Sequence, residues 1–241
     1  MSVEVFDTPD GLAGAAARAF AEKSREAIAA RGSFAVALAG GSTPKATYEV
    51  LARDHADTVD WPSVHVFFGD ERPVPPEHED SNYRMAGEAL LDHVPVGSVH
   101  RMRGELPPEE AASSYEEELR VFFGEDPPVL DLVMLGIGED GHTASLFPET
   151  SALEVTGRLA VANPVPKLGT TRITLTVPVL NAARDVLMLV AGEGKAEALE
   201  EILEGEDDPR AYPAKLVQPS GGPRWLVDRS AARKLQNLNE Y

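Results

Sequence analysis

A single histidine in a glycine-rich loop is the side chain of this sequence best placed for acid–base chemistry. The segment from Leu135 to Pro148 reads LGIGEDGHTASLFP and follows an apolar run that predicts a buried strand. Imidazole is the side-chain group best suited to proton transfer near neutral pH. Asp140 stands close enough in sequence to orient the His142 ring or to bind a ligand. A lone histidine is more often structural, but a position at the end of a central strand favours a catalytic role.

The same loop also matches the GxGxxG pattern of dinucleotide-binding sites, through Gly136, Gly138 and Gly141. Such a site needs a full helix directly after the last glycine, because the helix N-terminus receives the pyrophosphate. Pro148 interrupts the segment in which that helix would run. We therefore give this match no weight as a dinucleotide site.

Metal chemistry and a serine hydrolase are both disfavoured by motifs that the sequence lacks. Asp70, Glu71, Asp140 and His142 could converge on a metal ion, but there is no HxxxH pair, no HExxH pair and no cysteine. A Ser-His-Asp hydrolase would show a GxSxG nucleophile elbow, which is also missing. We expect no metal site.

A second motif, Gly40-Gly41-Ser42-Thr43-Pro44, lies between a predicted buried strand and a predicted helix. The glycines permit backbone geometry that other residues avoid, and the helix that follows offers unsatisfied N–H groups with a partial positive charge. With the two hydroxyl groups, these features make a cradle for a phosphate. The loop is not a Walker A motif, because GxxxxGK[ST] is absent. The alternative is a tight turn with a Ser/Thr helix cap.

A third motif, GDER, places Asp70, Glu71 and Arg72 just after another predicted strand. Ligands of open α/β sheets bind outside the carboxyl ends of the strands. Two acids and an arginine at that edge could bind sugar hydroxyls and an anion. The alternative, which we favour for this motif taken alone, is a solvated charged turn.

Two further cations follow predicted strand boundaries later in the chain. Arg172 opens a strand after the segment that begins at Lys167, and Lys195 sits at a Gly-rich turn from strand to helix. Arginine binds phosphate by a bidentate fork and lysine binds it as a point charge. The alternative for each is a helix cap or a surface ion pair.

Short apolar runs alternate with helical patterns along the whole chain, and this alternation is what must bring the motifs together. We expect strands at residues 3–6, 34–38, 64–68, 130–135, 159–162, 172–177, 186–191 and 224–227. We expect helices at residues 11–30, 44–52, 82–91, 107–123, 195–203 and 230–235, and an acidic loop at 70–80. The pattern predicts a mostly parallel sheet with helices on both faces, as one α/β domain over residues 1–241.

Composition excludes several classes of protein. Of the 241 residues 43% are hydrophobic, which is enough to form a core, so a mainly disordered chain is excluded. The 22 Lys and Arg residues against 40 Asp and Glu give a net charge of −18, which argues against nucleic-acid or anionic-membrane binding. The sequence has no cysteine, no apparent signal peptide and no apolar run of membrane-span length. We expect a cytoplasmic protein.

The motifs in this order resemble the 6-phosphogluconolactonase family, within the wider group of sugar-phosphate isomerases and glucosamine-6-phosphate deaminases. The matching segments are ALAGGSTPKATYEVLA, VHVFFGDERPVPPEHEDSNYRM, DLVMLGIGEDGHTASLFP and TRITLTVPVLNAARDVLMLVAGEGKA. The resemblance implies a Rossmann-like, NagB/RpiA-like α/β fold. It implies hydrolysis of 6-phospho-D-glucono-1,5-lactone to 6-phospho-D-gluconate in the oxidative pentose phosphate pathway, with no metal and no organic cofactor.

The resemblance also implies roles for the motif residues. His142 would be the base that activates water, with Asp140 beside it. The loop from Gly40 to Thr43, together with Arg172 and Lys195, would hold the 6-phosphate. Arg72 would help to bind the substrate, and Asp70 is our further candidate for a substrate contact. The only expected partner is the small sugar phosphate lactone, bound by a monomer or a small homo-oligomer.

Two rival functions remain at this point. An amino-sugar-phosphate deaminase or a sugar-phosphate isomerase on the same fold abstracts a carbon-bound proton and needs a carboxylate base. The deaminase pattern resembles MDEY and later FNEP, whereas this sequence has GDER and SLFP, which favour the lactonase. A sugar-phosphate sensor without catalysis is the second rival, and it would tolerate the loss of the histidine.

Overall fold

Short apolar segments build a central parallel sheet in the computed structural model, which describes residues 1–124 and 127–237 of the chain. Within these residues the sheet has seven strands in the order β1-β10-β9-β6-β2-β3-β5. Their bounds are β1 Ser2–Phe6, β10 Arg224–Asp228, β9 Asp185–Val190, β6 Leu132–Leu135, β2 Phe34–Leu38, β3 Val64–Phe68 and β5 Ser98–Val99. Residues 125–126 and 238–241, part of the single domain expected from the sequence, lie outside the described residues.

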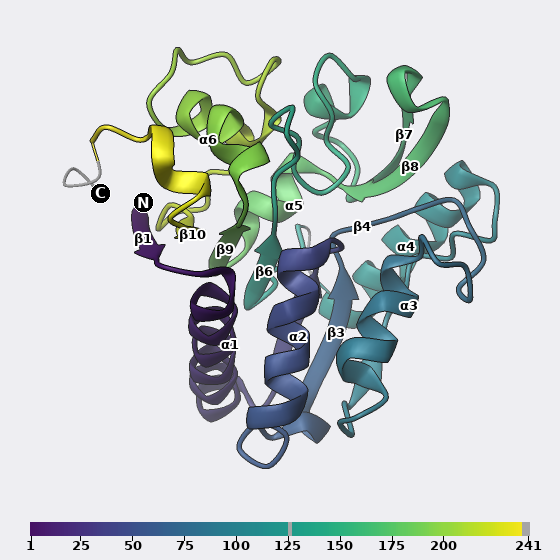
Figure 1. The fold of residues 1–241 in the computed structure, drawn as a ribbon. Helices are drawn as coiled ribbons and strands as arrows, with labels where there is room; N and C mark the ends of the chain where they lie inside the picture. Colours follow the sequence, from purple (N-terminus) through teal and green to yellow (C-terminus); the bar gives the residue numbers. More distant parts are fainter. Residues whose placement is uncertain (125–126, 238–241) are drawn as a thin grey trace.

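Helices cover both faces of this sheet. On one face α1 (Pro9–Arg31), α2 (Ser42–Asp54) and α3 (Asn82–Ala86) lie side by side, and α3 continues as a π-helical turn over Gly87–Leu91 (Figure 1). The other face packs against α4 (Pro108–Phe123), α5 (Val177–Ala182) and α6 (Ala196–Leu203). The expected α/β fold, a mostly parallel sheet flanked by helices, is confirmed.

The central strands are apolar throughout because both of their faces are covered. Phe34, Val36 and Leu38 of β2 belong to the core on the α1–α2 side, while Ala35 and Ala37 belong to the core on the other side. This division follows from the two-residue period of side chains along a strand. It also explains why the sequence shows continuous apolar runs here rather than alternation.

A second sheet, which the sequence analysis did not foresee, adjoins the first. Three strands form it in the order β4-β8-β7 within the described residues: β4 Asp70–Glu71, β8 Thr170–Leu175 and β7 Ala160–Val165. Both pairs of neighbouring strands, β4–β8 and β8–β7, are antiparallel. The strands expected at 159–162 and 172–177 are present, but the sequence analysis did not predict that they form a separate antiparallel sheet. The short connection through the 3₁₀ turn Pro166–Leu168 leaves no room for the crossover that a parallel pair needs.

Smaller differences concern short elements. The expected loop at 70–80 begins with β4, and the two-residue strand β5 was not expected, because such short strands leave no periodic pattern. The helix α5 lies where strand 172–177 was expected to end. Short 3₁₀ helices occupy Trp61–Ser63, Ser151–Glu154, Glu193–Lys195, Pro213–Leu216 and Ala231–Lys234, the last in place of the expected closing helix.

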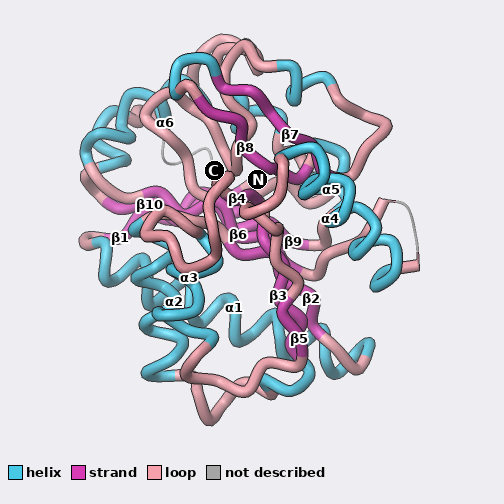
Figure 2. Tube along the Cα trace, turned by 90° about the vertical axis from the view of Figure 1, so that its right-hand side faces the viewer, coloured by secondary structure: helices cyan, strands magenta, loops and turns pink. Residues whose placement is uncertain are grey.

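The strand order places a crevice beyond the carboxyl ends of the neighbouring strands β2 and β6. The next strand of this sheet after β2 is β3, on one side, whereas the next after β6 is β9, on the other side, so the connections that leave β2 and β6 diverge. Open α/β sheets bind ligands at such a point. The small sheet stands at this end of the larger sheet (Figure 2). None of the helices within the described residues is long and apolar enough to cross a membrane.

Candidate active site

A pocket of about 550 Å³ opens at the crevice between β2 and β6. The loops after β2, β6 and β9 form its walls, together with β4 and the β7–β8 hairpin. The residues that were expected to act on the substrate or to bind it all line the pocket: Gly40, Gly41, Ser42, Thr43, Asp70, Arg72, Asp140, His142, Arg172 and Lys195. The fold therefore brings together side chains that are distant along the chain.

The loop after β2 is held in one conformation. Gly41 has a φ of +102°, which L residues with a side chain rarely adopt. A Cβ atom on Gly40 would collide with the side-chain amide of Asn82, so only glycine fits there. The buried Tyr48 hydroxyl accepts a hydrogen bond from the Ala39 N–H and donates one to the Ala39 carbonyl, both at 2.9 Å. These contacts fix the loop against the start of α2.

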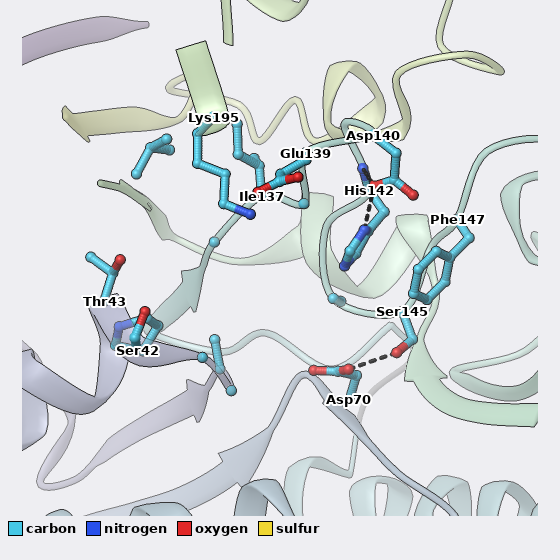
Figure 3. A pocket seen from close by; sticks show the side chains of 18 of the residues that line it. Ser42, Thr43, Asp70, Ile137, Glu139, Asp140, His142, Ser145, Phe147 and Lys195 are labelled. Carbon is cyan, nitrogen blue, oxygen red and sulfur yellow. Dashed lines mark hydrogen bonds and ion pairs between the residues drawn. The ribbon is translucent and has the colours of Figure 1, made fainter. Parts of the chain in front are cut away.

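The start of α2 presents polar groups to the pocket. The helix begins at Ser42, and Gly41 is its N-cap, so no side chain caps the first turn. Within the described part of the chain, the hydroxyls of Ser42 and Thr43 accept no capping bond, and both side chains line the pocket (Figure 3). The alternative that these hydroxyls cap the helix is therefore wrong. The free N–H groups and the helix dipole can receive an anion.

Three cations line the pocket without a counter-charge. Among the residues that the structure describes, Arg72, Arg172 and Lys195 form no ion pair, although Arg72 donates a hydrogen bond to the Asp80 carbonyl at 2.6 Å. The Nε of Arg172 is buried and has no hydrogen-bond partner in this part of the chain. Burial and the neighbouring Arg72 lower the pKa of Arg172. Because a half-buried cation without an ion-pair partner is unfavourable, these groups indicate a site for an anion.

The loop after β6 carries an ordered pair of acid and base. Nδ1 of His142 lies 2.5 Å from Oδ1 of Asp140. A carboxylate oxygen only accepts, so the proton is assigned to Nδ1, and Nε2 is left as the basic nitrogen. The imidazole stacks on Phe147, with ring centroids 4.1 Å apart and planes inclined by 24°. A Cβ atom on Gly138 would collide with the imidazole, which explains the glycine at that position.

The surroundings of His142 keep its imidazole neutral. Burial lowers its pKa to about 4, and the positive charges of Lys195, Arg172 and Arg72 act in the same direction. The carboxylate of Asp70 opposes them. The side chain is nevertheless 29% exposed, so the ring can be reached from the pocket. A neutral, accessible imidazole near pH 7 is the form in which histidine acts as a general base.

Asp70 lies at the floor of the pocket, on β4 rather than in a loop. It is 7% exposed, and its Oδ2 accepts a hydrogen bond from the Ser145 hydroxyl at 2.6 Å (Figure 3). The Asn82 amide donates to Oδ1 at 3.2 Å and to the Asp70 carbonyl at 2.9 Å. These contacts aim the carboxylate at the pocket from below.

Glu71, the neighbour of Asp70, does not line the pocket. It is 2% exposed and accepts hydrogen bonds at 2.8 Å from the backbone N–H groups of Arg72, Asn82 and Tyr83, and one at 3.1 Å from the Ser81 hydroxyl. Burial raises its pKa. Among the described residues no group of three or more His, Asp or Glu side chains is arranged to hold a metal ion. Glu71 is therefore a structural carboxylate that ties the two ends of the 71–83 segment together.

Sequence reasoning gave no role to four residues that complete the site. Ser145 and Asn82 hold Asp70, while Phe147 and Lys167 line the pocket beside His142. Ser145 and Phe147 lie in the DGHTASLFP segment and Asn82 in the SNYRM segment. The sequence analysis therefore recognised the segments that contain these residues but not the contacts that the residues make. The contacts of Ser145 with Asp70 and of Lys167 with Asp140 join residues of different elements, so no local signal reveals them.

The pocket thus has two unlike sides. The neutral imidazole of His142 faces the pocket from the loop after β6, and Ser42 and Thr43 at the start of α2 lie across the pocket from it (Figure 3). Lys195, Arg72 and Arg172 also line the pocket. Such a site suits a small molecule with an anionic group at one end and a bond to be hydrolysed or rearranged at the other.

Comparison with known proteins agrees with this reading. Residues 7–225 match the family model described as glucosamine-6-phosphate isomerases/6-phosphogluconolactonase. The chain is 48% identical over 217 residues to a 6-phosphogluconolactonase of Synechocystis sp., covering 88% of each chain. It is 42% identical over 240 residues to that of Nostoc sp., covering 97% of this chain and 98% of the other. The solved 6-phosphogluconolactonase of Trypanosoma brucei matches with a TM-score of 0.87 and 31% identity over 98% of each chain.

Proposed function

The chain belongs to the family of glucosamine-6-phosphate isomerases and 6-phosphogluconolactonases, and we propose that it is a 6-phosphogluconolactonase. It hydrolyses 6-phospho-D-glucono-1,5-lactone to 6-phospho-D-gluconate in the oxidative pentose phosphate pathway. The observation that carries the proposal is the position of a neutral His142 in the same pocket as the unpaired Arg172 and Lys195. Curated relatives with this activity, at 42% to 48% identity, support it.

In the proposed mechanism His142 is the general base. Its Nε2, which makes no hydrogen bond among the described residues, takes a proton from a water molecule, and the water oxygen attacks the C1 carbonyl of the lactone. The tetrahedral intermediate then breaks the bond between C1 and the ring oxygen. The ring oxygen takes the proton back from the imidazolium, so the ring opens to the acid and His142 returns to its neutral form.

The phosphate acts as a handle at the far end of the substrate. The N–H groups and hydroxyls of Gly40 to Thr43, with Arg172 and Lys195, bind the 6-phosphate. This binding places C1 near the water activated by His142, so binding energy is used for orientation. Arg72 binds the substrate beside Arg172. Asp70 contacts the substrate from the floor of the pocket, and its charge favours the imidazolium that forms during the reaction.

The rival deaminase or isomerase chemistry needs a free carboxylate base. Asp70 is the carboxylate at the pocket floor, and its two oxygens accept hydrogen bonds from Ser145 and Asn82. His142 has a free basic nitrogen instead. The sequences GDER and SLFP, in place of MDEY and FNEP, also favour the lactonase.

A direct assay separates the three functions. The purified protein is added to freshly prepared lactone in a pH-stat, and the acid release is compared with the uncatalysed rate, because this lactone also hydrolyses unaided. We expect fast release that saturates with substrate, and no ammonia from glucosamine 6-phosphate. Ammonia release would establish the deaminase, and tight binding of 6-phosphogluconate without turnover would establish the sensor.

The remaining proposals concern the protein's setting. With a net charge of −18 and no cysteine, we place it in the cytoplasm and assign it no nucleic-acid partner, no metal and no organic cofactor. It works as a monomer or a small homo-oligomer. Light scattering after size-exclusion chromatography measures the oligomer, and activity that survives exhaustive dialysis against EDTA checks the absence of a metal requirement.

A further inference from the structure

The tip of the β7–β8 hairpin contacts the loop that carries His142. Lys167, in the turn Pro166–Leu168, forms an ion pair with Oδ2 of Asp140. The other oxygen of this carboxylate, Oδ1, faces Nδ1 of His142. Nζ of Lys167 also lies 5.0 Å from the ring centroid of Phe147, the ring on which the imidazole stacks. Lys167 therefore touches both groups that hold the imidazole.

Strand pairing holds the hairpin that carries Lys167 in place. β7 and β8 pair from Ala160–Leu175 to Val165–Thr170, so the pairing extends to the residues that flank the turn. β8 also pairs with β4, the strand of Asp70. The hairpin that carries Lys167 thus belongs to the sheet that supplies Asp70 and Arg172, whereas Asp140 and His142 belong to a loop of the main sheet.

We propose that Lys167 is a positioning residue that acts on His142 through Asp140. Its ammonium group holds the carboxylate against Nδ1–H from outside the loop, and it neutralises part of the negative charge that the imidazole meets. The catalytic consequence rests on the proposed lactonase function. The contact itself is a property of the unliganded protein and can be measured without turnover.

Charge around the imidazole gives the sign of the effect. Besides Asp140 and Lys167, four charged groups from other elements act on His142: Asp70, Arg72, Arg172 and Lys195. Glu139, in the same loop as His142, also lines the pocket. Removing Lys167 leaves the charge of Asp140 uncompensated, which favours the imidazolium and raises the pKa of His142 from its lowered value. His142 acts as a base only when it is neutral. As the solution is acidified, the variant without Lys167 therefore loses activity at a higher pH than the parent protein does.

The test compares Lys167→Met with Lys167→Arg and with a matched control. Lys23→Met removes a lysine that also pairs with an aspartate, Asp185 at 3.0 Å, and neither residue of this pair lines the pocket. Lys167 is 49% exposed and Lys23 32%, so we expect all three variants to fold, which circular dichroism verifies. The first readout is the NMR signal of the His142 ring in unliganded protein between pH 7 and pH 3, a range that spans its lowered pKa, assigned by its loss in His142→Gln.

We expect Lys167→Met to move the titration midpoint upward by about half to one pH unit, Lys167→Arg to restore it, and Lys23→Met to match the parent. On the lactone, kcat of Lys167→Met falls about tenfold with KM nearly unchanged, because the base is misaligned but the phosphate site is intact. Superimposable titration curves for Lys167→Met and the parent overturn the proposal. So does a raised KM with an unmoved titration, which makes Lys167 a substrate contact. A parent protein without lactonase activity refutes the proposed function but leaves the titration test in force.

Discussion

At the scale of single residues, the site depends on cations that have no ion-pair partner among the described residues. The chain carries a net charge of −18, yet Arg72, Arg172 and Lys195 stand in the pocket without a carboxylate partner among the described residues. They attract an anion locally although the overall field repels it, because screening confines charge effects to about 10 Å at ordinary salt. The same cations help to keep His142 neutral, so one set of charges both binds the substrate and prepares the base.

The first residue-scale prediction concerns His142. Replacing it with Gln retains a similar size and polarity but removes the proton acceptor, so we expect kcat to fall by about 10²- to 10⁴-fold. The affinity for 6-phosphogluconate, measured by calorimetry, should change little, because the proposed phosphate site is made of other residues. His93→Gln, at an exposed position outside the pocket, is the matched control. Near-normal turnover of the His142 variant would remove this residue from the mechanism.

The second residue-scale prediction concerns Arg172. Its buried Nε has no partner within the described residues, so we expect it to donate to the phosphate of the bound substrate. Arg172→Met should raise KM, and weaken product binding, by about ten- to a hundredfold, as for the loss of a charge-assisted hydrogen bond. Arg224→Met, which removes a cation paired with Glu4, is the control. Unchanged saturation behaviour of the Arg172 variant would contradict the phosphate assignment.

At the scale of elements, Glu71 shows how a loop of irregular chain is held under the site. The segment from Arg72 to Ser81 leaves β4 and returns to α3, and the Glu71 carboxylate accepts hydrogen bonds from both of its ends. This closure sets the start of α3, where Asn82 holds Asp70. A buried carboxylate outside the pocket thereby determines the position of one inside it.

Glu71→Gln tests this structural role. The Gln NH₂ group would replace the carboxylate oxygen that faces the Tyr83 N–H and the Ser81 hydroxyl. The hydroxyl can turn to accept from the NH₂ group, but the buried N–H cannot, so at least one hydrogen bond is lost. We expect the free energy of unfolding in urea to fall by about 1–3 kcal/mol. Glu117→Gln, on the exposed side of α4, should leave stability unchanged within about 0.5 kcal/mol. Equal stability of the two variants would mean that Glu71 does not hold the segment.

At the scale of the whole molecule, one sheet separates two cores that share its strands. Trp61 belongs to the core on the α1–α2 side and Trp225 to the core on the α4–α6 side. Alternate residues of β2 contribute to both cores, so neither core can be completed without the sheet. We propose on this basis that residues 1–241 form a single domain.

The two tryptophans, the only ones in the sequence, make this proposal testable. In Trp225→Phe the fluorescence reports on one core, and in Trp61→Phe it reports on the other. For a single cooperative unit, fluorescence and far-UV circular dichroism should give the same urea midpoint within each variant. A fluorescence midpoint that departs from the circular dichroism midpoint in either variant would reveal two independently unfolding parts.

The larger part of the fold was predictable because its signals are local. Continuous apolar runs marked β2, β3, β6 and β9 nearly to the residue, and helical patterns between them marked the layers. The antiparallel sheet was missed because β7 and β8 carry the same strand signal as the others. Which sheet a strand joins depends on partners distant in the chain, and the two-residue strands β4 and β5 are too short for any periodic signal.

By itself the sequence determined which residue types stand at the strand ends: the glycines of the phosphate loop, the histidine with its aspartate, and the cations. The tertiary structure alone decided their partners. It turned Glu71 away from the pocket while Asp70 faces it, left the Nε of Arg172 unpaired, and brought Lys167 from another sheet onto Asp140. The physical reason is that chemical identity is carried by each residue, whereas burial, charge compensation and hydrogen bonding depend on neighbours that only folding supplies.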